Sequence, residues 1–145
     1  MRLSFRFRAV LYLVVTALFG TGAAWIAVDR AAWPETATYL LRLHGGAAMA
    51  MLVLLGALLP LHVRVGWRRG RNRISGILML ASNAVLVGTA FGLYYLGSDT
   101  VRHWTSETHT ALGFALPLLI AAHVLLGRRG RRAREQRLAG LRQGR

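Results

Sequence analysis

Four long runs of apolar residues, separated by short polar connections, dominate the chain. They predict helices over about residues 9–28, 39–62, 74–96 and 106–127. Each run is long enough to cross the roughly 30 Å hydrocarbon core of a bilayer. Residues 128–145 form a polar, basic tail. The pattern predicts an all-α fold: an integral membrane four-helix bundle that forms a single transmembrane domain of 145 residues.

The composition supports this class and removes several others. Hydrophobic residues make up 54% of the chain and charged residues only 17%, which is typical of a membrane protein. The chain has no cysteine. Disulfides, covalent haem attachment through a CxxCH motif and cysteine-ligated iron–sulfur clusters are therefore excluded within this chain.

The arginines are distributed unevenly between the two ends of the predicted helices. Sixteen lie in the N-terminal segment, in the connection between the second and third helices, and in the tail. The opposite side holds three: Arg30, Arg42 and Arg102. The positive-inside rule then places both termini in the cytoplasm. Topology and contact with anionic lipid account for the net charge of +14, so we expect no nucleic-acid binding.

Four of the five histidines form two pairs, one on each of two helices. His44 and His62 are 18 residues apart on the second helix, and His109 and His123 are 14 residues apart on the fourth. At 100° per residue, each pair lies on nearly one face of its helix. The topology places His44 and His109 in an outer layer, and His62 and His123 in an inner layer. This arrangement predicts two non-covalently bound haems b, each with two histidine ligands to its iron.

Two features leave the outer ligand and the spacing open. In regular helices the rise is roughly 27 Å from His44 to His62 but roughly 21 Å from His109 to His123, and Pro60 is expected to kink the second helix near His62. His103 is an alternative outer ligand. It precedes the helix start expected at residues 105–107, so His109 is preferred. Zinc or copper is less favoured, because no carboxylate or thiol accompanies the histidines.

The residues expected to line the outer haem are small or cationic: Gly45, Gly46, Gly113, Arg42 and Arg102. Gly45 and Gly46 come directly after His44, and Gly113 follows His109 by one turn, where small residues are expected to leave room for a porphyrin. The two arginines are candidates for pairing with the haem propionates. Arg64 and Arg68 are the corresponding candidates on the inner side.

The segments LRLHGGAAMAMLVLLGALLPLHVRVGW and ETHTALGFALPLLIAAHVLLGRR resemble the small four-helix bacterial di-haem b cytochromes of the cytochrome b-561-like group. That group includes subunits that anchor hydrogenases and formate dehydrogenases in the membrane. The resemblance implies electron transfer across or within a bacterial cytoplasmic membrane. It also implies exchange with quinone or quinol and with a partner redox protein or a larger respiratory or photosynthetic complex.

Two other classes of protein fit part of the pattern. One is a haem-free structural or anchoring subunit of a larger membrane complex. The other is a small transporter with histidines as proton relays, which the absence of carboxylates inside the spans disfavours. Whether the chain is an electron-transfer protein by itself or a subunit of an oxidoreductase is left open by the sequence.

Overall fold

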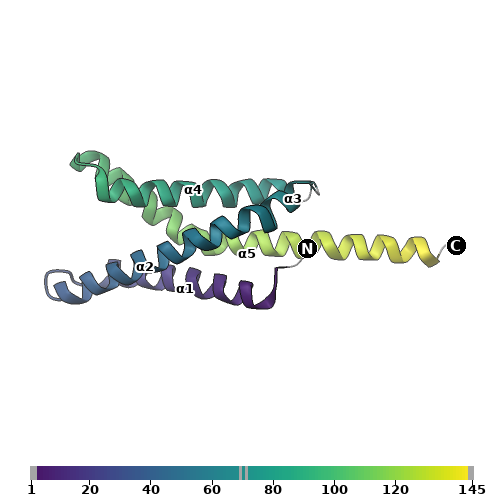
Figure 1. Cartoon of the computed structure of the whole chain (residues 1–145), viewed down its shortest axis with the longest axis horizontal. Helices are drawn as coiled ribbons and strands as arrows, with labels where there is room; N and C mark the ends of the chain where they lie inside the picture. Colours follow the sequence, from purple (N-terminus) through teal and green to yellow (C-terminus); the bar gives the residue numbers. More distant parts are fainter. Residues whose placement is uncertain (1–2, 69, 71, 144–145) are drawn as a thin grey trace. The chain divides into compact units, whose positions relative to one another are not determined.

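The computed structural model describes residues 3–68, 70 and 72–143, and this part of the chain is helical with no strand (Figure 1). The helices are α1 (Phe5–Ala27), α2 (Pro34–Leu58), the π-helical turn η1 (Leu59–Val63), α3 (Arg64–Arg68), α4 (Arg73–Tyr95) and α5 (Asp99–Gln143). Four helical stretches are long and apolar enough to cross a membrane: Phe5–Ala27, Pro34–Arg68, Arg73–Tyr95 and Asp99–Leu141. The predicted all-α class with four membrane-length helices is confirmed. Of the arginines counted above, Arg2, Arg69, Arg71 and Arg145 lie outside the described residues.

The helices form two hairpins that belong to separate compact units, Met1–Val65 and Gly66–Arg145. In the first unit α1 packs against α2, and in the second α4 packs against α5. Short connections make the two helices of each hairpin antiparallel (Figure 1). In the first connection, the carboxylate of Asp29 accepts hydrogen bonds from the backbone N–H groups of Ala31 and Ala32, at 3.0 and 3.2 Å. This Asx-type turn reverses the chain between α1 and α2.

The first two helices begin earlier than the hydrophobic pattern predicts, at residues 5 and 34 rather than at about 9 and 39. The side chain of Ser4 caps α1 by accepting a hydrogen bond from the backbone N–H of Phe7 at 3.1 Å. Pro34 occupies the first turn of α2, where its missing N–H costs nothing, and Glu35 follows it. Polar residues at these starts belong to helical first turns, so apolar content alone places the boundaries too late.

The start of α5 corrects a prediction that bears on the choice of ligand. The helix begins at Asp99, not at residues 105–107, and the carbonyl of Ser98 accepts its first hydrogen bond, from the N–H of Arg102 at 2.9 Å. The hydroxyl of Thr105 donates to the carbonyl of Val101 at 2.7 Å. Thr105 is therefore a helix-interior residue rather than a cap, and His103 lies inside α5. The helix also continues through the basic tail to Gln143.

The π-helical turn η1 corrects the expected geometry of the second helix. Pro60 lacks the N–H that a regular helix requires, and the chain closes this turn with an i→i+5 bond from Arg64 N–H to the carbonyl of Leu59. Such a turn holds more residues than an α-turn, so each residue advances by less than 100°. The five whole turns that place His44 and His62 on one face of a regular helix therefore do not apply. The same turn shortens the rise between them, which reduces the mismatch with the pair on α5.

Gly92 allows α4 and α5 to approach closely. A methyl group on Gly92 would lie 3.0 Å from Leu96 Cδ1 and 3.1 Å from Thr105 Cγ2, whereas one on Gly88 would meet nothing within 4 Å. The branched side chain of Thr105 has few rotamers into which it can withdraw. Gly92 is therefore required by packing within this hairpin.

We expect Gly92→Ala to destabilise the protein relative to Gly88→Ala by about 1–3 kcal/mol, the usual cost of overpacking. Both substitutions gain the same helix propensity of roughly 1 kcal/mol, so their difference isolates the steric term. Thermal unfolding of the two variants in detergent, followed by circular dichroism, measures it. Equal stability of the two variants would contradict this account of Gly92.

Candidate functional site

His44 lies on the face of α2 that packs against α1. Ala37 and Met51, seven residues before and after His44 and so on nearly the same face, are buried. The Nδ1 atom of His44 is 3.0 Å from the hydroxyl oxygen of Thr21 on α1. A methyl group on Gly22 would lie 3.3 Å from His44 Cε1, so the glycine allows the ring to approach the backbone of α1.

His109 makes the equivalent contact in the second hairpin. Its Nδ1 atom is 2.9 Å from the hydroxyl oxygen of Thr89 on α4. This contact places His109 on the face of α5 that meets α4, and Leu116, two turns further along α5, is buried. His109 is half-buried, whereas His103 is exposed and packs edge-on against the neighbouring Trp104. The predicted helix start after His103 was wrong, because α5 begins at Asp99, but His109 is the one of the two whose ring contacts α4.

His123 is held at two points near the other end of the same hairpin. Its Nδ1 atom is 3.0 Å from the hydroxyl oxygen of Ser75. Its backbone carbonyl accepts a hydrogen bond from the side-chain amide of Asn72 at 3.2 Å. Asn72 precedes α4 with a left-handed backbone, at φ 55°, a conformation that asparagine tolerates better than most residues. Ring and backbone at this position are thus both fixed by the start of α4.

The two contacts in the second hairpin follow one register. Ser75 and Thr89 are 14 residues apart on α4, as His123 and His109 are on α5. Because the helices are antiparallel, this equal spacing lets each hydroxyl contact one ring: Ser75 contacts His123, and Thr89 contacts His109. The sequence analysis missed the roles of Thr21, Ser75 and Thr89. For the second hairpin, the signal was this matching interval of hydroxyl residues and histidines on consecutive helices.

The remaining predicted site residues have less defined surroundings. His62 lies in η1 and is exposed. Arg42 and Arg102 are exposed, and Gly45 is half-buried. A methyl group on Gly46 or on Gly113 would meet nothing within 4 Å. These two glycines are therefore not required by contacts among the described residues. The space at Gly113 lies one turn after His109, whereas Gly46 is about 200° around the helix from His44 and is exposed.

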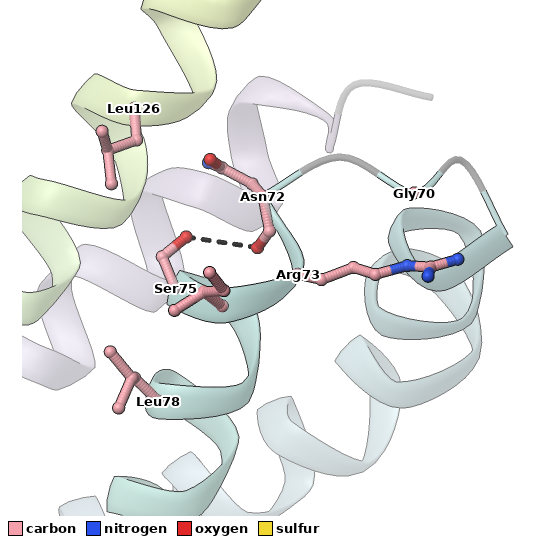
Figure 2. A pocket seen from close by; sticks show the side chains of 7 residues that line it. Gly70, Asn72, Arg73, Ser75, Leu78 and Leu126 are labelled. Atoms are coloured by element: carbon pink, nitrogen blue, oxygen red, sulfur yellow. Dashed lines mark hydrogen bonds between the residues drawn. The ribbon is translucent and has the colours of Figure 1, made fainter.

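An open hollow of about 540 Å³ lies next to His123 (Figure 2). Its lining residues are Gly70, Asn72, Arg73, Ile74, Ser75, Leu78 and Leu126. In Figure 2, Leu78 and Leu126 form one side of the hollow, and the side chain of Arg73 extends away from them. The Arg73 guanidinium instead donates to the carbonyl of Trp67 at 3.0 Å. The hollow therefore offers mainly apolar surface beside the Ser75–His123 contact.

The predicted layers join histidines from different hairpins, so the pairing of His44 with His109 and of His62 with His123 stays a prediction. Among the described residues, no group of three or more His, Cys, Asp or Glu side chains forms a metal-binding cluster. A haem iron takes four of its bonds from the porphyrin and needs only two from the protein. Two histidines for each iron would therefore be enough, without a cluster of three ligands.

Comparison of the chain with models of known protein families, with characterised proteins and with solved structures gave no match.

Proposed function

We propose that this chain is a membrane-bound b-type cytochrome that carries two haems and transfers electrons across or within the membrane. His44 and His109 would hold the outer haem iron, and His62 and His123 the inner one. The observation that carries the proposal is the common setting of three of these histidines. Each of those three is on a membrane-length helix and has its Nδ1 atom against a hydroxyl of the neighbouring helix.

The chemistry of the residues fits haem. Iron-binding histidines usually bond to the metal through one ring nitrogen and to a protein acceptor through the other. Here the hydroxyl contacts involve Nδ1, so Nε2 would be the nitrogen that binds the iron. A side chain on Gly113, one turn after His109, would meet nothing within 4 Å, and this open space would suit a porphyrin. When bound, haem supplies a one-electron redox centre, and the protein contributes ligands, spacing and electrostatics.

The resemblance to di-haem b cytochromes extends the proposal to location and partners. The chain would reside in a bacterial cytoplasmic membrane with both termini inside. It would exchange electrons with quinone or quinol and with a partner redox protein or larger complex. Arg42 and Arg102, both exposed, are the candidates for contact with the propionates of the outer haem.

Protein purified from membranes is expected to contain two non-covalently bound haems b per chain. Extraction with acidified acetone and quantification of the pyridine complex would give the stoichiometry. The reduced-minus-oxidised absorption spectrum would show whether both irons are low-spin, as two imidazole ligands require. One haem per chain would mean that only one layer forms. A colourless protein would overturn the proposal and favour the structural subunit.

A further inference from the structure

The hydroxyls that touch the histidines are themselves bonded to their own helices. Thr21 Oγ1 lies 2.6 Å from the carbonyl oxygen of Ala17, and Thr89 Oγ1 lies 2.8 Å from that of Val85. Ser75 Oγ lies 3.2 Å from the carbonyl oxygen of Asn72. A carbonyl only accepts hydrogen bonds, and a hydroxyl has one proton to give. In each case the hydroxyl therefore donates to the carbonyl.

The direction of the contact with histidine follows. Since the hydroxyl proton is used by the carbonyl, the hydroxyl oxygen accepts from the ring, and Nδ1 carries the proton. In a neutral imidazole the lone pair is then on Nε2. The hydrogen-bond network thus assigns the same tautomer to His44, His109 and His123. Nδ1–H is the tautomer that a ligand bonding through Nε2 requires.

We propose that Thr21, Thr89 and Ser75 are positioning residues, which hold His44, His109 and His123 as Nδ1–H tautomers with Nε2 as the iron-binding atom. The part of this inference that concerns iron rests on the proposed function, whereas the tautomer of the three histidines does not depend on it. An acceptor at Nδ1 also makes the imidazole a stronger electron donor. Because ferric iron benefits more from a strong donor than ferrous iron, these hydroxyls lower the reduction potential of the haem that they serve.

Thr89 offers the sharpest test, because valine has its shape without its hydroxyl and serine has the hydroxyl without the methyl group. Thr38 provides a matched control. Its hydroxyl makes the same type of backbone bond, to the carbonyl of Pro34 at 2.9 Å, but it is exposed at the start of α2. The full-length variants Thr89→Val, Thr89→Ser and Thr38→Val would each be purified from membranes together with whatever haem they bind in the cell.

In Thr89→Val, the Nδ1–H proton of His109 is expected to exchange faster with solvent in the NMR spectrum of the reduced, diamagnetic protein. Haem affinity should fall about 10–100-fold, the usual effect of removing a partner of a metal ligand. The potential of one haem should rise while that of the other stays unchanged. Thr89→Ser should restore all three properties, and Thr38→Val should leave them as in the wild type.

Unchanged proton exchange, affinity and potential in Thr89→Val would overturn the positioning role, as would a failure of Thr89→Ser to restore them. A wild-type protein without haem would instead overturn the proposed function. In that case the ¹⁵N shifts of the His109 ring still decide on the tautomer: loss of Nδ1 protonation in Thr89→Val supports the role of Thr89, and an unchanged ring refutes it.

Discussion

His123→Ala and His62→Ala are each expected to remove the low-spin signal of the same haem, while the other haem keeps its spectrum. Each substitution leaves the inner iron with one imidazole and an open position, so that haem is lost or becomes high-spin. The outer ligands lie roughly 20 Å away along the helices, so the effects should be independent. His44→Ala and His109→Ala are expected to affect the other haem in the same way. Absorption and electron paramagnetic resonance spectra of the four variants measure both irons.

His103→Ala is the matched control, because this residue is on the same helix as His109 but is exposed beside Trp104. It should spare both haems. If His62→Ala and His123→Ala perturb different haems, the pairing is wrong. If His103→Ala removes the outer haem and His109→Ala does not, the outer ligand is His103.

A reporter enzyme that is active only in the periplasm is expected to be silent when fused after the C-terminus. The reason is the distribution of arginines, 16 on one side of the spans and three on the other, which orients the helices during insertion. The same reporter inserted between Val28 and Trp33, or between Leu96 and Ser98, should be active. Enzyme activity in whole cells, normalised to the amount of fusion protein, gives an all-or-none result.

Activity of the C-terminal fusion with silent loop fusions would reverse the topology and exchange the inner and outer histidines. A reporter that is active only in the cytoplasm should be active after the C-terminus and silent in the two loops. This control distinguishes a fusion that is silent because of its location from one that has been degraded.

The hydrophobic pattern predicted the class and number of the long helices, because a membrane span is recorded directly in the length of an apolar run. It misplaced the start of α5 because Thr105 and Ser106 resemble a cap. In the structure the hydroxyl of Thr105 is used inside the helix, by the carbonyl of Val101. Whether a threonine caps a helix or lies inside it depends on which hydrogen bond its hydroxyl makes, and the residue type alone does not show this.

The histidines were found from their spacing, but their partners were not. Thr21, Ser75 and Thr89 are small polar residues in apolar helices, where a bond to the preceding turn is the ordinary explanation. Only the antiparallel register of each hairpin brings a hydroxyl to a ring. The irregular helix around His62 has a different origin. Pro60 predicted an irregularity, but its form, a turn closed by an i→i+5 bond, depends on how the backbone recovers its hydrogen bonds.

The two hydroxyl–histidine contacts of the second hairpin fix the separation between His109 and His123 along α5. Ser75 and Thr89 hold His123 and His109 at two points separated by roughly 21 Å of helix. Sliding α5 along α4, or rolling it about its own axis, would break both bonds together, so the two contacts oppose rigid-body displacement of the helix. Under the proposed function, the two contacts would keep the iron-binding histidines at a constant separation along α5, and the rate of electron tunnelling between haems depends steeply on their distance.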